Sequence, residues 1–242
     1  MLLRLENAAA SMSEMQRHQD RVANNLANAD TVGYKRDRLF TTALNERLDA
    51  EGAPRSDRRF RQGNDLSAGT LEETGNPLDV ALGGDGFFVT QNEATGEQRY
   101  TRAGHFVVDN EGTLRTPGGL AVMGEGGPLQ LPVDTGGAIE ISKSGEIRVD
   151  NRRIGTLRVV TFDNPQQQLQ RAEGAAFAAD GAAPQEAEDP LVLQGTVETS
   201  NVDPVAEMTD MIEHFRLFES QQKALRTTDS VLSRATRDLG EL

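Results

Sequence analysis

The chain has 242 residues, enough for one large domain or for a medium-sized domain with additional elements. Its formal net charge of −13 argues against nucleic acid as the main partner, because binding to phosphates requires clustered Lys and Arg. Cysteine is absent, which excludes disulfides and thiolate metal sites, and 5% aromatic with 26% charged residues suits an elongated molecule better than a compact globule with one deep pocket.

The N-terminal segment carries a heptad pattern that predicts a helix from about residue 3 to 28. Its apolar positions alternate spacings of three and four, with a polar interruption at Gln19, and they are Leu5, Ala8, Met12, Met15, Val22, Leu26 and Ala29. The turn formers of residues 30–33 end the pattern. We assign residues 1–34 to an N-terminal coiled-coil helix.

Three asparagines near the end of this helix are unusual. Asn24, Asn25 and Asn28 each lower helix propensity by on the order of half a kcal/mol relative to Ala. They either mark a fraying helix end or form amide hydrogen bonds to neighbouring helices that set the register of packing.

The middle of the chain loses the helical period. Residues 35–75 are polar and include several arginines, which predicts an extended linker arm. Residues 76–198 contain short runs with a period of two, separated by turn formers about every ten residues, which predicts a central antiparallel β domain of sandwich or barrel type. Within it, residues 172–190 are rich in Ala, Gly, Glu and Pro and are predicted to form a surface loop.

A second long helix is predicted within residues 199–242. Asp203 and Pro204 are the residue types of an N-cap and a first helical position, and apolar residues then recur at spacings of three and four. Neither terminal helix has a long continuous apolar surface, so each is marginal alone. We therefore expect an α+β fold in which the two helices flank the β domain and pair as a coiled coil.

Candidate chemistry is sparse, and we predict no enzyme, no cofactor and no catalytic or metal site. His18, His105 and His214 fall on three different predicted elements without the spacing of metal ligands, which favours structural or surface roles. The glycine-rich loop 83–86 precedes an apolar strand rather than a helix, so a hairpin turn is favoured over a phosphate-binding loop. The start of the chain lacks the apolar run of a signal peptide, and no stretch approaches the roughly 20 apolar residues of a membrane span, so no membrane insertion is expected.

Four segments closely resemble the signatures of one family, the flagellar axial proteins, which comprise the rod and hook subunits. They occur in the family's order and are residues 23–35 (ANNLANADTVGYK), 74–88 (TGNPLDVALGGDGFF), 100–114 (YTRAGHFVVDNEGTL) and 195–212 (GTVETSNVDPVAEMTDMI). The chain length and the ending RLFESQQK are more similar to the proximal rod protein of F type than to the distal one, which usually has Tyr where Phe218 stands.

This resemblance implies a structural subunit of the basal-body rod that polymerises helically into a torque-transmitting shaft. It also implies export through the flagellum's own secretion channel without a cleaved signal peptide, and a place in the rod in the periplasm. The implied partners are copies of the chain, other rod subunits and, in transit, the flagellar export apparatus. The alternatives are a distal rod or hook subunit, a monomeric adaptor whose helices fold back on its own domain, and a periplasmic enzyme that acts on the cell wall.

The assembly interface is predicted to lie on the two terminal helices, with apolar seam positions and the three register-setting asparagines. These residues are Leu5, Met12, Met15, Val22, Asn24, Asn25, Leu26, Asn28, Met208, Ile212, Phe215, Phe218 and Leu225.

Overall fold

The computed structural model describes residues 2–43, 47–48, 54–55, 58–132, 137–181 and 183–240, and among these it describes the side chains of residues 12–38, 63–132, 137–181, 183–223 and 226–227. The chain folds into two compact units. The helical unit comprises Met1–Ala27 with Asp203–Leu242, and the β unit comprises Asn28–Val202.

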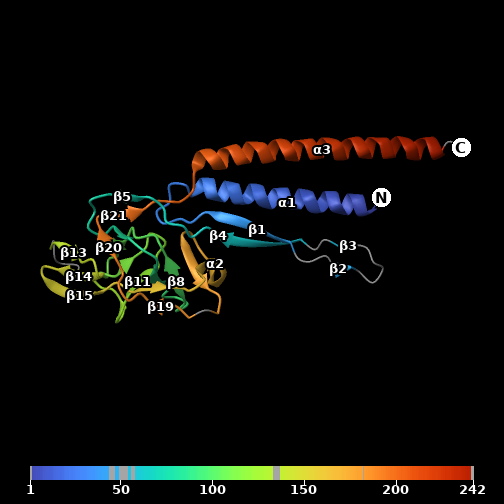
Figure 1. The fold of residues 1–242 in the computed structure, drawn as a ribbon. Helices are drawn as coiled ribbons and strands as arrows, with labels where there is room; N and C mark the ends of the chain where they lie inside the picture. The colour runs from blue at the N-terminus through green and yellow to red at the C-terminus, as the bar shows by residue number, and fades with distance from the viewer. Residues whose placement is uncertain are drawn as a thin grey trace. The chain divides into compact units, whose positions relative to one another are not determined.

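The helical unit consists of two long helices, α1 (Leu2–Ala27) and α3 (Pro204–Gly240). They contact each other side by side and run in opposite directions (Figure 1). The start of α3 follows from local chemistry, because the Asp203 carboxylate accepts hydrogen bonds from the backbone N–H groups of Val205 at 2.9 Å and Ala206 at 3.2 Å. Pro204 occupies the first helical position, where its missing N–H is no loss. The sequence-based prediction of this helix start is confirmed.

The β unit is built from antiparallel strands around one large sheet. Its central path runs in the order β17-β18-β8-β7-β11-β10-β9, with β12 attached to β11 and β16 and β19 attached through β7. The strands of this sheet are β7 (Phe87–Gln91), β8 (Gln98–Thr101), β9 (Val107–Val108), β10 (Leu114–Arg115), β11 (Ala121–Gly124), β12 (Gly127–Pro128), β16 (Val159–Thr161), β17 (Leu169–Arg171), β18 (Ala176–Ala179) and β19 (Gln185–Glu186).

Smaller sheets complete the β unit, together with the short helix α2 (Pro165–Gln168). One has three strands, β13 (Ile139–Ile141), β14 (Glu146–Val149) and β15 (Arg152–Thr156). The others are the pairs β1 (Asp37–Ala43) with β4 (Arg58–Asn64), β2 (Arg47–Leu48) with β3 (Pro54–Arg55), β5 (Leu71–Glu73) with β21 (Thr196–Glu198), and β6 (Val80–Leu82) with β20 (Val192–Gln194). All strand pairs among the described residues are antiparallel, so the α+β class with antiparallel sheets is confirmed.

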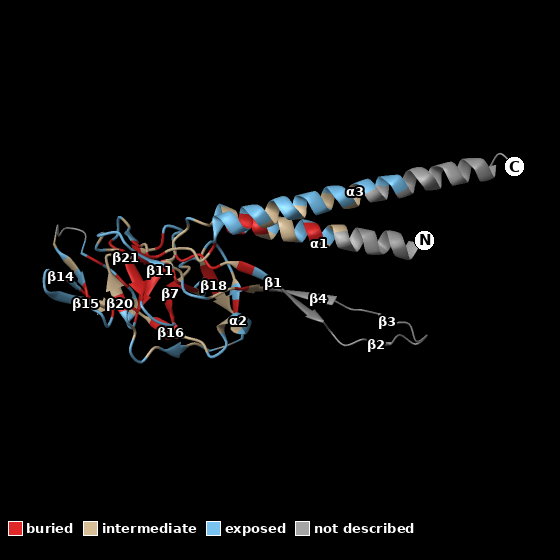
Figure 2. Cartoon of the chain, turned by 45° about the horizontal axis from the view of Figure 1, so that its top comes forward, coloured by how far each residue is buried: buried red, intermediate tan, exposed pale blue. Residues whose placement is uncertain are grey.

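Strand β7 lies at the centre of the core because both of its faces are covered. Side chains alternate across a strand, so Phe88 joins one apolar cluster while Phe87 and Val89 join a second on the opposite face. Figure 2 shows the buried residues concentrated in this part of the β unit. Full burial of one such side chain stabilises the fold by about 1.5–3 kcal/mol.

The prediction of a surface loop over residues 172–190 is wrong for β18. This strand pairs with β17 on one side and β8 on the other, and Phe177 on it is fully buried. The prediction failed because an Ala-rich run lacks the β-branched residues that indicate a strand, and pairing with distant segments overrode the local composition.

Candidate functional site

The predicted seam residues of α1 lie on its inward side. Met15 and Val22 are buried, and Met12 and Leu26 are half-buried. The Leu5 side chain lies outside the described residues. Between residues 12 and 27, where the side chains of α1 are described, the exposed residues are polar or small, so this part of the helix has one apolar face.

The three asparagines at the end of α1 differ in their surroundings. Asn25 is buried, Asn28 is half-buried and Asn24 is exposed. A buried amide is retained in a helix only where hydrogen bonds satisfy it. Asn25 is therefore better placed than Asn24 to set register, and that role stays a prediction.

The predicted seam residues of α3 fall on two different faces. Phe218 lies on an inward strip with Glu207, Met211 and His214, which recur at spacings of three and four and are buried or half-buried. Three other predicted residues face away from that strip and are about half exposed, and they are Met208, Ile212 and Phe215. The Leu225 side chain lies outside the described residues.

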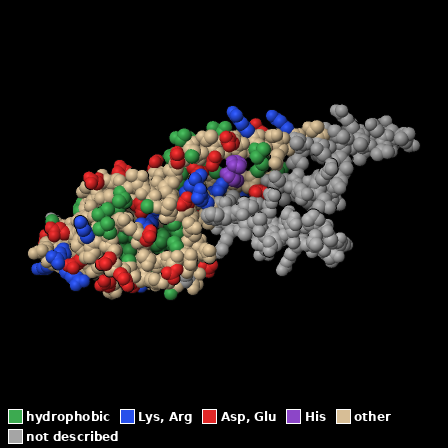
Figure 3. Space-filling view, in the orientation of Figure 1, with side chains coloured by type: hydrophobic (Ala, Val, Ile, Leu, Met, Phe, Trp, Pro, Cys, Tyr) green, Lys and Arg blue, Asp and Glu red, His purple; other side chains and the backbone are tan. Residues whose placement is uncertain are grey.

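We call the exposed apolar strip of α3 the outer face, and it consists of Val205, Met208, Ile212 and Phe215. Spacings of three, four and three place these residues on one side of the helix over three turns. Val205 is 73% exposed and Ile212 is 55% exposed. Hydrophobic side chains are visible on the surface of α3 in Figure 3. Exposed apolar strips of this kind are typical of surfaces that contact another molecule.

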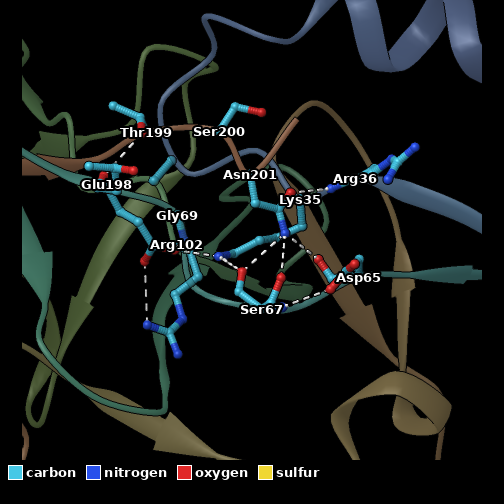
Figure 4. Close-up of polar contacts among 12 residues, drawn as sticks. Lys35, Arg36, Asp65, Ser67, Gly69, Arg102, Glu198, Thr199, Ser200 and Asn201 are labelled. Carbon is cyan, nitrogen blue, oxygen red and sulfur yellow. Dashed lines mark hydrogen bonds and ion pairs between the residues drawn. The ribbon is translucent and has the colours of Figure 1, made fainter. Parts of the chain in front are cut away.

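A buried polar cluster in the β unit joins segments that are far apart in the sequence. We call it the clasp, and it consists of Lys35, Arg102, Glu198 and Asn201 with the backbone around Ser67 and Gly69 (Figure 4). Lys35 and Glu198 are almost completely inaccessible to solvent, and Arg102 is only 5% exposed. Buried charges persist only where they are paired and hydrogen-bonded, so the geometry of these contacts determines whether the fold tolerates them.

Glu198 is the centre of the clasp. Its carboxylate forms an ion pair with the Lys35 ammonium, and Arg102 Nη1 lies 3.4 Å from its other oxygen. The Gly69 backbone N–H donates to the same carboxylate at 2.8 Å. The Lys35 ammonium also donates to the Ser67 carbonyl at 2.7 Å. Burial lowers the pKa of Lys35, and the hydrogen bond from Lys35 to Glu198 acts in the opposite direction.

Asn201 adds a second connection between the ends of the β unit. Its Oδ1 accepts from the Arg36 backbone N–H at 2.7 Å, and its Nδ2 donates to the carbonyls of Asp65 at 2.8 Å and Ser67 at 3.0 Å. Because Arg36 follows the N-terminal helix in sequence and Asn201 precedes the C-terminal one, this amide holds together the two segments through which the chain enters and leaves the β unit.

Arg171 on β17 secures the same N-terminal segment. Its guanidinium lies 4.2 Å from the centre of the Tyr34 ring, and its Nε donates to Asp37 at 2.8 Å. Its Nη2 donates to the Lys35 carbonyl. A planar guanidinium can stack on an aromatic ring and donate in its own plane at once, which a lysine could not do.

Sequence reasoning missed the clasp because its members are polar residues without local periodicity. One signal was present, since Lys35, Arg102, Glu198 and Asn201 each fall inside one of the signature segments. Sequence reasoning also placed His18 and His214 on separate elements, and the structure brings their rings together.

The β unit also contains a cavity of about 350 Å³. Its lining is mostly apolar and includes Val32, Pro117 and His105, whose Nδ1 lies 2.7 Å from Asp79.

Within the described residues, no three His, Asp or Glu side chains gather in a way that could hold a metal ion. Every helix in the described part of the chain is too short or too polar to serve as a membrane span.

Comparison with known proteins matches three family models along the chain. Residues 5–35 match the model described as flagella basal body rod protein, residues 81–149 match the flagellar hook protein FlgE/F/G D1 domain, and residues 193–238 match the flagellar basal body rod FlgEFG protein C-terminal. All three matches overlap the predicted signature segments.

Curated relatives match over nearly their full length. The flagellar basal-body rod protein FlgF of Caulobacter vibrioides is 32% identical, with 94% of each chain covered. FlgF of Salmonella typhimurium is 34% identical, with 95% of each chain covered. The flagellar basal-body rod protein FlgG of Bacillus subtilis is 32% identical, with 96% of this chain and 97% of the relative covered.

Proposed function

The chain belongs to the flagellar basal-body rod protein family and is a structural rod subunit rather than an enzyme, and from this premise we propose that it polymerises helically through its terminal helices into a torque-transmitting shaft. We propose that its partners are further copies of itself and neighbouring rod subunits, and that it reaches the periplasmic part of the rod through the flagellar export apparatus. Among rod subunits we assign it to the F type, in line with its similarity to FlgF proteins.

The observation that carries this proposal is the outer face of α3. A helix that had finished its packing against α1 would show polar residues to solvent, but α3 presents Val205, Met208, Ile212 and Phe215 there. Covering these side chains with a second helix would remove apolar area worth about 25 cal/mol for each Å². In a helical polymer every copy uses the same two complementary surfaces, so the partner for this face is a helix of another copy.

The contact between α1 and α3 supports the same assembly. We propose that the two helices pair as a coiled coil within each subunit, with Met15, Val22 and Leu26 on α1 and Phe218 on α3 in the seam. Met208, Ile212 and Phe215 then form contacts between subunits, and the asparagines near the end of α1 set the register. The inward positions of Met15, Val22 and Asn25 are consistent with this arrangement.

Replacement of one outer-face residue tests the proposal. Ile212→Asp places a charge in the proposed contact between copies, so we expect the chain to fold and yet fail to enter rods, with swimming lost. The matched control is Ser220→Asp, which adds the same charge at an exposed position of α3 away from the outer face, and it should swim normally. Incorporation is measured in isolated basal bodies and swimming in soft agar. Normal swimming of the Ile212→Asp strain would contradict the proposal.

A second substitution tests the seam itself. Leu26→Asp should abolish polymerisation and swimming while leaving the β unit folded, as measured by its resistance to proteolysis. The mass of the unsubstituted protein recovered from basal bodies tests the export proposal, because a chain exported by the flagellar apparatus should retain its N-terminal residues.

A further inference from the structure

Two histidines meet where α1 and α3 pack within the helical unit. The ring centroids of His18 and His214 are 3.5 Å apart, and the ring planes are inclined by 33°. At this separation the rings are in van der Waals contact, and neither water nor an ion fits between them. Two positively charged imidazoles at this distance would repel each other strongly, so at most one of the two rings is protonated in the observed contact.

A hydrogen bond identifies the protonation state of His18. Arg21 Nη2 lies 2.7 Å from His18 Nε2. A guanidinium has only N–H donors, so Nε2 must accept, and the single proton of the neutral ring sits on Nδ1. That Nδ1 is buried and has no hydrogen-bond partner among the described residues. A protonated ring would carry a proton on both nitrogens. Its Nε2–H would then face the N–H of Arg21, and two hydrogen-bond donors in that position repel each other.

Most of the influences on His18 disfavour its protonated form. Burial, Arg21 and His214 together lower the pKa of His18 to about 4 from the ordinary value of 6.5. Asp210 on α3 favours the charged form but does not outweigh the other three. Glu14 lies one turn before His18 on α1.

We propose that His18, in contact with His214, forms an acid-sensitive latch between α1 and α3, which is closed while His18 is neutral and opens when acid protonates His18. Opening frees the inward strip of α3, which carries Met211 and Phe218, for contact with a helix of another molecule. The latch is a property of the single chain, so it does not depend on how copies assemble.

The sign of the pH dependence follows from the lowered pKa of His18. A free or unfolded His18 takes up a proton near pH 6.5, whereas the closed form resists protonation until about pH 4. The stability that the closed contact contributes is therefore complete above pH 6.5 and is lost progressively as the pH falls toward 4. Below that value, both forms are protonated and the loss levels off.

Two measurements on the purified full chain test the latch. The sequence has three histidines, so NMR can follow each ring separately, with assignment by His18→Gln, His105→Gln and His214→Gln. Since cysteine is absent, Ser13→Cys and Ser220→Cys can carry a fluorophore pair at exposed positions of α1 and α3. We expect His18 to titrate near pH 4 and energy transfer between the helices to fall between pH 6.5 and 4.

Variants separate the histidines from the carboxylates that titrate in the same range. His18→Gln keeps an acceptor for Arg21 but cannot be protonated, so its energy transfer should stay constant over this range. Arg21→Gln keeps a donor and removes the charge, so the titration of His18 should move toward pH 6.5. If His18→Gln disturbs the helices at pH 7, His214→Gln replaces it, and here too the His18 titration should shift upward. An unchanged fall in transfer in His18→Gln, or a His18 that titrates at pH 6.5 in the native chain, would overturn the proposal.

Discussion

The β unit buries both apolar and charged side chains, whereas α3 of the helical unit leaves a strip of apolar side chains exposed. In the β unit, Phe88 and Phe177 are fully buried, and even the charged groups of Lys35 and Glu198 are withdrawn from water. On α3, the outer face leaves Val205 and Ile212 mostly in solvent. A unit that buries charges needs every one of them satisfied by its own atoms, whereas a helix that exposes apolar residues needs a partner. We therefore expect the β unit to be stable within one chain and the helical unit to need a second copy.

The largest expected effect is the loss of stability when the buried ion pairs of the β unit are broken. Glu198→Ala leaves the ammonium of Lys35 and the guanidinium of Arg102 buried without their shared carboxylate, so the free energy of unfolding should fall by about 3–5 kcal/mol. Urea denaturation followed by far-UV circular dichroism measures the loss.

A matched control for this prediction exists on the surface of the same unit. Glu97 pairs with Arg99 at 2.6 Å, but the Glu97 side chain is largely exposed. Glu97→Ala should therefore cost less than about 1 kcal/mol. If the two substitutions lowered the free energy of unfolding equally, the clasp would contribute no more to stability than an exposed ion pair. The contrast between the two units would then weaken.

An intermediate effect is expected at Asn201. Asn201→Ala leaves the Arg36 N–H and the carbonyls of Asp65 and Ser67 without that partner, which should lower the free energy of unfolding by about 1–3 kcal/mol. Asn92→Ala is the control, because the Asn92 side chain accepts from Ala94 N–H in an exposed turn, where water replaces the lost bond. A smaller loss for Asn201→Ala than for Asn92→Ala would show that the amide is dispensable.

Those elements of the fold that depend on neighbouring residues were predictable. The start of α3 follows from Asp203 and Pro204, and the β14–β15 turn follows from Asp150 and Asn151, which adopt the positive φ values of 50° and 67° that this residue type tolerates. The period of two between residues 76 and 198 indicated antiparallel strands for the same reason, since a strand covered on one face alternates along its own length.

Elements that depend on distant residues were not predictable from patterns. Lys35 and Glu198 are 163 positions apart, and periodicity carries no information about such a pair. Strand β18 likewise owes its place to Tyr100 and Thr101, which pair with Phe177 and Ala176. On α3, the heptad pattern included both Phe215 and Phe218, but it could not show that only the second faces inward.

The smallest expected effect is that of Ile212→Ala, and it sharpens the comparison most directly because the same substitution can be made in both units. Ile147 in β14 is buried in the core, and Ile147→Ala should lower the free energy of unfolding by about 2–5 kcal/mol through lost contacts and the cavity left behind. Ile212→Ala removes the same atoms from the outer face of α3, where they touch mainly water in the free chain, so the loss should stay below about 0.5 kcal/mol. Urea denaturation of both variants at low protein concentration measures the difference. Equal losses would mean that Ile212 is already covered within a single chain, and the outer face would then be unavailable to another copy.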